Sequence, residues 1–405
     1  MRAKVAATIV AGVRRRGVLP RREQHAALAF LSNNTVNWLN LHYGFHALAL
    51  GMAGVFFASF LLAAGLPAPT VLAVLAAIFG GRFFIRPLIL PLARRFGLKA
   101  LVIAGTLLTA AQYPLLAQVH GLGAPLIALC VVASTGDTLY WTTYHAYFAA
   151  LGDPEHRGHQ VGAREAAAAV MGVIGPLVGG WALVTVGPQA AFGAAGLVLA
   201  ASAIPLLRTP EVTIARQAPG ALRAALPGVL IFVADGWVQA GFYFLWQIAL
   251  FVTLGRNFAA FGGAMALSAL VGAVSGLVLG RLIDRGHGLR VVWLAVGALA
   301  AVIVFRAAGY ASPLPAVIAS AAGAVVTAIY TPTVMTAVYN QARLSPCILR
   351  FQIAAEGGFD AGCATGCLAT ALMLWGGAPL FAALLLPLIG AAAMFALLRR
   401  HYAAA

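Results

Sequence analysis

The chain has 405 residues, of which 62% are hydrophobic and only 9% are charged. Soluble globular domains contain about 25% charged residues, so this composition excludes a soluble fold and predicts that lipid is the main solvent. The net charge of +16 lies mainly at the termini and in alternate loops. That distribution orients a membrane protein and does not suit binding of nucleic acid.

The N-terminal residues 1–43 are predicted to form a basic cytoplasmic arm. They include Arg14-Arg15-Arg16 and Arg21-Arg22 but lack a hydrophobic core followed by a cleavage site, so no cleaved signal peptide is expected. Twelve apolar runs follow, each long enough to cross roughly 30 Å of hydrocarbon. The predicted spans are 44–65, 68–91, 99–119, 122–149, 161–185, 187–207, 227–253, 258–282, 290–310, 313–339, 351–374 and 377–398.

The longest polar stretch between spans, residues 208–226, is predicted to be a cytoplasmic linker between an N-terminal half (44–207) and a C-terminal half (227–405). The N-terminal arm, the linker, the short C-terminal tail and four alternate loops hold 22 of the 26 Lys and Arg residues. Because basic residues stay on the cytoplasmic side, we expect both termini in the cytoplasm of a bacterium, with the spans in its inner membrane.

A short basic loop occurs twice, as Pro91–Lys99 and as Leu282–Arg290, which indicates an internal duplication. Tyr140 and Tyr330 are separated by a similar interval. The second copy resembles the motif between helices 2 and 3 of the major facilitator superfamily. The matching positions, which we interpret as gating residues, are Asp284, Arg285, Gly288 and Arg290, with Arg94, Arg95, Gly97 and Lys99 in the first copy.

The resemblance covers the chain from about residue 40 and implies an all-α polytopic fold of twelve transmembrane helices in two six-helix pseudo-repeats. It implies a secondary transporter. The first copy departs from the family pattern, because Arg94 stands where the family usually has Asp. Its gating ion pair must therefore be different or absent.

The span 161–185 contains a second motif, Gly175-Pro176-Leu177-Val178-Gly179-Gly180. It resembles the signature of proton-coupled exporters in the superfamily, in which small residues let helices approach closely and the proline kinks the helix. The alternative is ordinary packing of small residues. The span 122–149 lacks the Arg that drug exporters usually carry ahead of the glycine matched by Gly136, so the motifs alone leave export open.

Ionisable groups are expensive in hydrocarbon and are functional candidates by default. Glu356 and Asp360 lie one turn apart, on the same helical face as Gln352, Cys363 and Cys367, so this face is predicted to line a central cavity. We interpret the two acids as proton carriers. The alternative is that Arg350 or another helix holds them as a packing lock.

Asp137 and Asp235 are two further acids within predicted spans, each in a stripe of polar and aromatic residues. Arg82 and Arg86 lie one turn apart at a comparable depth. Arg82 either pairs with Asp137 in a proton-sensitive lock, which we favour, or attracts an anionic substrate with Arg86. The predicted cavity residues are Tyr140, Trp141, Tyr144, His145, Gln239, Tyr243, Trp246 and Gln352.

Metal binding has weaker support. His42 and His46 are one turn apart and could bind a metal with Cys363 and Cys367 as soft partners, but spacing identifies no third ligand. Interfacial histidines satisfied by backbone or water are the simpler interpretation. The chain has no Gly-rich Lys nucleotide motif, no catalytic triad spacing and no sign of a cofactor, so we expect neither an ATP-driven pump nor an enzyme.

Together these features predict a monomeric secondary transporter that moves a small molecule by alternating access between its halves. We expect a proton-coupled antiporter, with export of a small amphipathic or cationic molecule favoured. The alternatives are an importer, a transporter of a metal or metal chelate, and a non-transporting membrane scaffold or sensor of the same fold.

Overall fold

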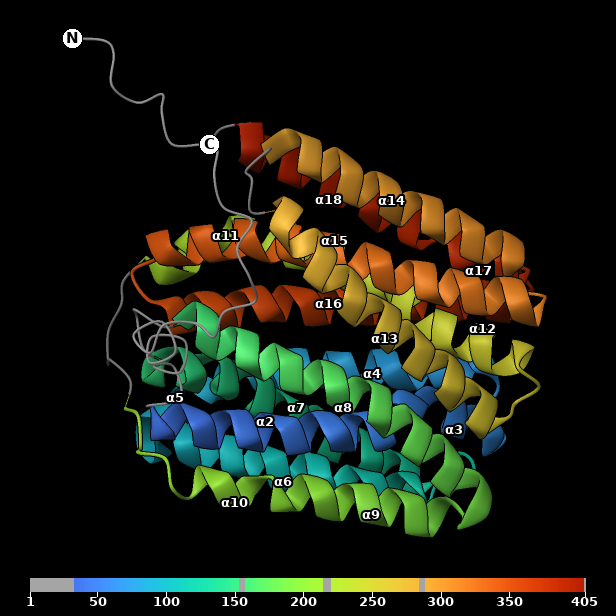
Figure 1. The fold of residues 1–405 in the computed structure, drawn as a ribbon, viewed down its shortest axis with the longest axis horizontal. Helices are drawn as coiled ribbons and strands as arrows, with labels where there is room; N and C mark the ends of the chain where they lie inside the picture. The colour runs from blue at the N-terminus through green and yellow to red at the C-terminus, as the bar shows by residue number, and fades with distance from the viewer. Residues whose placement is uncertain (1–32, 153–156, 214–219, 284–287, 404–405) are drawn as a thin grey trace, which may run out of the picture.

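The computed structural model describes residues 33–152, 157–213, 220–283 and 288–403, and all the regular structure within them is helical. Twelve of the helical segments are long and apolar enough to cross a membrane, which confirms the predicted all-α fold. Because their number is even, the described ends at Asn33 and Ala403 lie on the same side, which we call the terminal side (Figure 1). The opposite side is called the far side.

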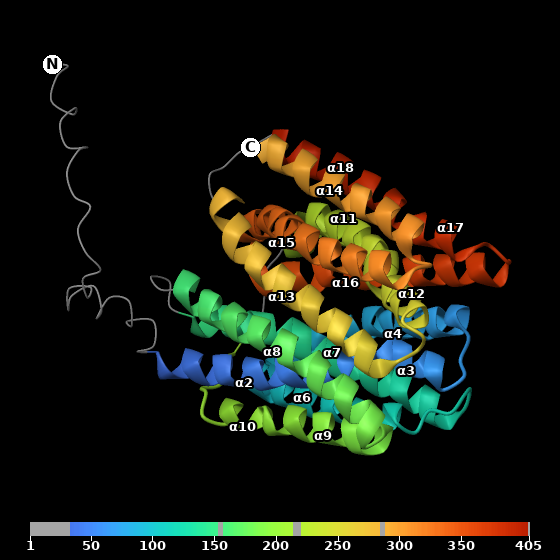
Figure 2. The same ribbon diagram turned by 45° about the vertical axis from the view of Figure 1, so that its right-hand side comes forward.

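The first six spans lie together in the lower part of Figure 1, and the last six lie in the upper part. Figure 2 shows the same separation after rotation. The first six are α2 (Asn34–Met52) with η2 (Gly54–Phe56) and α3 (Phe57–Ala63); α4 (Ala68–Ile85) with η3 (Arg86–Leu88) and α5 (Ile89–Phe96); α6 (Leu98–Leu116); α7 (Ala124–Leu151); α8 (Arg157–Thr185); and α9 (Pro188–Ala201) with α10 (Ala203–Leu206).

The last six spans include one that changes helix type at mid-depth. They are α11 (Ala221–Gln239) with the π-helix η4 (Ala240–Leu245) and α12 (Trp246–Thr253); α13 (Phe258–Ile283); α14 (Gly288–Gly309); α15 (Pro313–Leu344); α16 (Ile348–Trp375); and α17 (Leu380–Leu385) with α18 (Pro387–Ala403).

The first helix begins earlier than predicted. It starts at Asn34, inside the segment 1–43 assigned to the N-terminal arm, because the side chain of Asn33 accepts a hydrogen bond from the Val36 N–H at 3.1 Å. Such an N-cap satisfies one of the free donors at a helix start. The first turn contains polar residues, so hydropathy alone did not predict that the helix begins there.

The two sets of six helices meet mainly along two helix pairs, α4 with α16 and α8 with α13. The second pair is in backbone contact. A Cβ atom added to Gly262 would lie 2.3 Å from the Pro176 carbonyl oxygen, and one added to Gly180 would lie 2.6 Å from the Phe258 carbonyl oxygen. The glycine motif at 175–180 therefore brings α8 against the other half of the molecule.

The same motif also packs α8 against the first helix of its own half. A Cβ added to Gly179 would lie 2.2 Å from the Met52 carbonyl oxygen, and one added to Gly175 would lie 2.7 Å from the Gly51 Cα. Small residues allow this close approach between helices in a membrane. The motif thus joins α2, α8 and α13 with no room for larger side chains.

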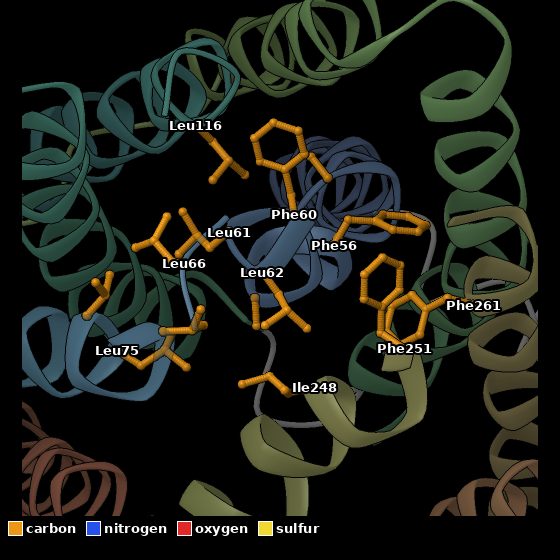
Figure 3. Packing of buried hydrophobic residues seen from close by; sticks show 14 of the residues in the cluster. Phe56, Phe60, Leu61, Leu62, Leu66, Leu75, Leu116, Ile248, Phe251 and Phe261 are labelled. Carbon is orange, nitrogen blue, oxygen red and sulfur yellow. The ribbon is translucent and has the colours of Figure 1, made fainter. Parts of the chain in front are cut away.

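An aromatic cluster joins the two halves on the far side. The ring of Phe56 lies 5.7 Å from that of Phe261 and 6.2 Å from that of Phe258. Phe251, on the last helix of the seventh span, packs against Phe258 at 4.9 Å. Figure 3 shows Phe56, Phe251 and Phe261 turned toward one another, with Leu62 beside Ile248. Apolar packing therefore closes the far side between the halves.

Replacing Gly262 by valine should weaken the contact between α8 and α13, because the added atoms would collide with backbone that cannot move aside. Overpacking of this kind costs about 1–3 kcal/mol. The thermal unfolding midpoint of purified protein in detergent should fall clearly below that of the wild type. Gly263→Val is the matched control, since a Cβ there meets no atom within 4 Å; equal melting of the two variants would contradict the packing argument.

Candidate functional site

Two arginines of the second span bind two acids of the eleventh span across the interface between the halves. The Arg86 Nη1 atom lies 2.5 Å from Glu356 Oε2, and Arg86 Nε donates to Asp360 Oδ2 at 2.8 Å. Arg86 Nη2 also contacts Asp360 Oδ2. Arg82 Nε approaches Asp360 Oδ1 to 2.9 Å without hydrogen-bond alignment, so that contact is ionic.

Local structure explains why these four side chains meet. Each pair is spaced four residues apart, which places both members on one helical face. Arg86 stands where α4 passes into η3, directly before Pro87, and a proline cannot continue regular helical bonding. Since α4 packs along α16, the two charged faces oppose each other between two helices long enough to span a membrane.

A threonine and a third acid from the fourth span complete this group. Arg86 Nη1 donates to Thr142 Oγ1 at 2.5 Å, and Thr142 Oγ1 donates to Glu356 Oε2 at 3.0 Å. Arg82 Nη1 lies 3.6 Å from Asp137 Oδ2, so Arg82 is shared between an acid of its own half and Asp360. We call the set of Arg82, Arg86, Asp137, Thr142, Glu356 and Asp360 the inter-half network.

The network is buried but unequally so. Asp360 is fully buried and Arg86 is 2% exposed, whereas the Asp137 side chain is 24% exposed. With all groups ionised, three carboxylates face two guanidinium groups, which leaves one excess negative charge. Asp137 makes the longest of the ion pairs and is the most exposed acid, so it is where that excess is most available to a cation.

Asp137 and Arg82 also line a cavity of about 180 Å³ that lies between the network and the far-side aromatic cluster. Its wall comes from the first, second, third, fourth and seventh spans. Of the residues predicted to form the cavity, Trp141 and Tyr243 do line it. The full lining is His46, Leu50, Gly54, Phe57, Ala58, Leu75, Ile78, Phe79, Arg82, Thr109, Gln112, Tyr113, Ala133, Asp137, Trp141, Tyr243, Phe244 and Gln247.

Other predicted cavity residues are not among those that line it. Tyr140 and Tyr144 are fully buried, with their rings stacked 5.4 Å apart. Trp246 is 3% exposed. His145 stacks on Trp141, and Gln352 on α16 is half-buried.

Three polar residues of the cavity wall were not predicted from the sequence. Thr109 and Gln112 come from α6, and Gln247 comes from α12. The buried Thr109 Oγ1 and Gln247 Nε2 atoms have no hydrogen-bond partner among the described residues. Gln112, an amide in an apolar span, was the available signal, because polar groups in a membrane usually face the bundle interior.

The two histidines proposed as weak metal ligands have different environments. His42 Nδ1 lies 2.7 Å from the Ser202 carbonyl oxygen and Nε2 lies 3.0 Å from Tyr140 Oη, so both ring nitrogens are engaged. His46 stacks on Tyr140 at 4.0 Å and lines the cavity with no partner for either nitrogen in the described part of the chain. Within those residues, no group of three or more His, Cys, Asp or Glu side chains could hold a metal ion.

The duplicated tyrosines have parallel roles in the two halves. Tyr140 on α7 bonds the titratable His42 of the first span, and Tyr330 on α15 donates to Asp235 Oδ1 of the seventh span at 2.9 Å. Gln239 Nε2 lies 3.4 Å from the same Asp235 oxygen. Among the described residues, no ion pair is formed by Asp235, so hydrogen bonds alone stabilise it there.

The first copy of the basic loop receives its acid from the linker. The Lys99 N–H donates to Glu211 Oε1 at 2.8 Å, and Lys99 Nζ donates to the Thr209 carbonyl oxygen at 2.7 Å. A carboxylate at a helix N-terminus is favourable. Glu211 thus supplies the negative charge that Arg94 cannot. Arg95 lies over the Phe96 ring at 5.3 Å.

The second copy is only partly visible. Asp284 and Arg285 lie outside the described residues. Gly288 begins α14, and Arg290 is exposed on its first turn.

Gly97 makes the contact with Glu211 possible. It has φ +83° and ψ 172°, a conformation that other residues adopt at a cost of about 1–3 kcal/mol, and an added Cβ would lie 2.3 Å from Glu211 Cδ. Gly97→Ala should therefore lower the melting midpoint more than Gly187→Ala, which shares the conformation (φ +85°, ψ 166°) but has open space. Equal losses in a thermal unfolding assay would mean that the linker contact contributes nothing.

Comparisons with known proteins agree with this architecture. The family described as the Major Facilitator Superfamily matches residues 39–347. The chain is similar to the crystal structures of an auto-inhibited POT family peptide transporter (TM-score 0.67, 14% identity, 93% of this chain and 97% of that one) and of the human organic anion transporter MFSD10 (0.66, 15%, 90% and 99%). It also resembles FucP in the outward conformation (0.63, 14%, 90% and 98%). Identities this low show the fold alone.

The chain is also similar in part to the multidrug resistance protein MdtH of two bacteria. It is 30% identical over 158 residues to MdtH of Aeromonas salmonicida (strain A449) and of Aeromonas hydrophila subsp. hydrophila. The matched region spans 38% of this chain and 39% of each relative. The match across residues 39–347, the twelve spans and the shared fold therefore show that the chain belongs to the Major Facilitator Superfamily of secondary transporters.

Proposed function

We propose that this protein is a proton-coupled antiporter that exports a small amphipathic or cationic molecule across the bacterial inner membrane, with both termini in the cytoplasm. The single observation that carries the proposal is the inter-half network beside the cavity. Arg82 and Arg86 hold Glu356 and Asp360 of the opposite half. An ionic contact between the moving halves is where protonation can be converted into opening.

The proposed coupling follows from charge. Breaking a buried ion pair by removing one charge leaves the other uncompensated. If Glu356 and Asp360 take up protons, the two guanidinium groups lose their partners in the second half. Arg82 then keeps Asp137, which belongs to its own half. Protonation therefore replaces contacts between halves by a contact within one half, and the terminal side can separate.

On the far side, the aromatic cluster holds the two halves together. This cluster has no titratable groups at the Phe56, Phe258 and Phe261 contacts, so its stability does not depend on protonation of its own side chains. The inter-half network would weaken on protonation, whereas the aromatic cluster would not. Protonation would therefore favour the state in which the terminal side is open and the far side is closed. Rocking of the halves around a central site is the general mechanism of this fold.

The cavity supports a small cationic substrate. Its volume of about 180 Å³ is below the roughly 300–1,000 Å³ of drug-sized sites. Aromatic rings form much of the wall, and Asp137 offers the excess negative charge beside them. A cation near aromatic faces is attracted by their quadrupoles. A proton and a cationic substrate would compete for Asp137, as exchange requires.

The partial similarity to MdtH also supports export. Those relatives are named multidrug resistance proteins, and the direction of transport is proposed here from that name together with the glycine motif at 175–180. Because the similarity to MdtH covers a minority of either chain, we use it to support export and not to identify the substrate. The cavity chemistry carries the substrate class.

Glu356→Gln combined with Asp360→Asn should abolish proton-driven transport, since neither side chain can then exchange a proton or hold an arginine by charge. Tetramethylammonium, a cation much smaller than drug-sized molecules, is the probe, and movement of its radiolabelled form in proteoliposomes is followed after a pH gradient is imposed. We expect at least a tenfold loss of the gradient-driven rate, which corresponds to about 1.4 kcal/mol.

The matched control is Glu165→Gln. This acid pairs with its neighbour Arg164 and is 56% exposed, so its neutralisation leaves the inter-half network intact. Wild-type rates in the doubly substituted protein would overturn the proposed coupling. Loss of transport in the Glu165 control as well would show that the assay reports general damage.

A further inference from the structure

We infer that Arg306 is a positioning residue that holds the π-helical turn of the seventh span and thereby fixes one wall of the cavity. It lies on α14 and is not among the residues that line the cavity. The inference about cavity shape stands on its own, while its consequence for substrate affinity rests on the proposed function. Four observations lead to it.

The first is a direct bond to the backbone of the π-helix. Arg306 Nη1 donates to the Phe242 carbonyl oxygen at 2.5 Å, in the middle of η4. A π-turn shifts the helical hydrogen-bond step and often marks a functional site. In a membrane, backbone oxygens freed from a regular helix need partners from neighbouring helices. Arg306 is such a partner for η4.

The second observation is that this cation is buried without an acid. Arg306 is 5% exposed, and in the described part of the chain no carboxylate lies within ion-pair distance of it. Its guanidinium instead lies 4.0 Å from the Phe242 ring centroid and 4.7 Å from that of Trp246. A buried cation within a membrane-spanning helix is expensive unless it has a function, and its shortest hydrogen bond and both ring contacts are to the seventh span.

The third observation is the space that α15 leaves for the side chain. A Cβ added to Gly323 would lie 1.9 Å from Arg306 Nη2, so any other residue at this position would push the guanidinium aside. Arg306 Nε also lies 3.4 Å from the Ala319 carbonyl oxygen on the same helix. The arginine is therefore held between α14, α15 and the π-helix in one position.

The fourth observation connects the arginine to the cavity. Tyr243 and Phe244 follow Phe242 within η4, and both line the cavity together with Gln247 one turn later. The Tyr243 side chain is 41% exposed. A shift of the Phe242 carbonyl would rotate these three side chains as a unit. Arg306 thus sets the cavity wall without touching its contents.

The test measures thiol labelling at residue 243 in membranes, which needs no transport. Tyr243→Cys is placed in a protein whose native cysteines (Cys130, Cys347, Cys363 and Cys367) are replaced by alanine. Adding Arg306→Met should change the labelling rate by roughly three- to tenfold, as expected for loss of one net hydrogen bond. Phe57→Cys, which lines the cavity from the first span, is the internal reference and should keep its rate.

Three further variants keep the test decisive if Arg306→Met does not fold. Gly323→Ala should displace the guanidinium and change labelling at position 243 in the same direction, and Arg306→Lys should give an intermediate rate. Arg256→Met, which removes an exposed arginine, should have no effect. Unchanged labelling at 243 in Gly323→Ala and Arg306→Lys, or an equal change at 57, would overturn the inference.

Transport then separates this inference from the proposed function. In tetramethylammonium assays, Arg306→Lys should raise the KM several-fold while the maximal rate stays near that of the wild type. If labelling changes as expected but the wild-type protein shows no proton-driven tetramethylammonium flux, the positioning role stands and the proposed function fails. If proton-driven flux is normal but labelling at position 243 is unchanged, the proposed function stands and the positioning role of Arg306 fails.

Discussion

The need to pair ionisable groups on membrane-spanning helices organises the contact between the halves. Two arginines and three carboxylates meet between the halves. Arg86 and Asp360 are buried and the other three side chains are only partly exposed, so charged partners stabilise the group more than water can. The partners are divided between the halves, so the pairing can be complete only when α4 lies against α16. In the proposed mechanism, the ion pairs therefore form when the terminal side closes and break when it opens.

The other contacts between the halves suit this arrangement. Gly180 and Gly262 bring α8 and α13 into backbone contact, and such small-residue surfaces can slide or rock without breaking specific bonds. The far-side cluster around Phe56 and Phe261 adds apolar packing that carries no charge. Arg306 keeps the π-helix of the seventh span in place between these regions. The molecule thus combines one charge-dependent closure with rigid packing that positions the cavity wall.

The linker has a part in the same scheme. Glu211 reaches the N-terminus of α6 at the first basic loop, where Arg94 replaces the acid expected there. The two copies of the loop are consequently unequal: the first depends on a carboxylate from elsewhere in the chain, and the second carries Asp284 in its own sequence. An internal duplication has kept the fold while its two loops obtain negative charge differently.

Much of the fold was predictable, since twelve long apolar runs and alternating basic loops allow few alternatives in a bilayer. The members of the network were predictable as well, because Glu356, Asp360 and Arg82 are costly in lipid. Of their pairings, only that of Arg82 with Asp137 was predicted. Helical spacing gives the face on which a residue lies but not the helix that face meets, so the pairing of Arg86 with Glu356 needed the tertiary structure.

Uncharged and packed features were harder to predict. Thr142 and Gln112 give weak signals among apolar neighbours, and nothing in the sequence around Phe242 marks a π-helix. Tyr140 and Tyr144 were predicted to face the cavity but are buried against His42 and His46. An aromatic stripe has the same spacing whether it faces a cavity or a neighbouring helix.

The distance between the terminal-side ends of α5 and α16, measured as a function of pH, shows whether protonation opens the inter-half network. Spin labels at Phe96 and Ile348, both exposed, report it by pulsed electron resonance in lipid nanodiscs. If protonation of Glu356 and Asp360 releases the arginines, the distance should lengthen at acidic pH in the wild type. It should be long at every pH in the Glu356→Gln/Asp360→Asn protein. A distance that ignores pH in the wild type, or still follows it in the variant, would contradict the account.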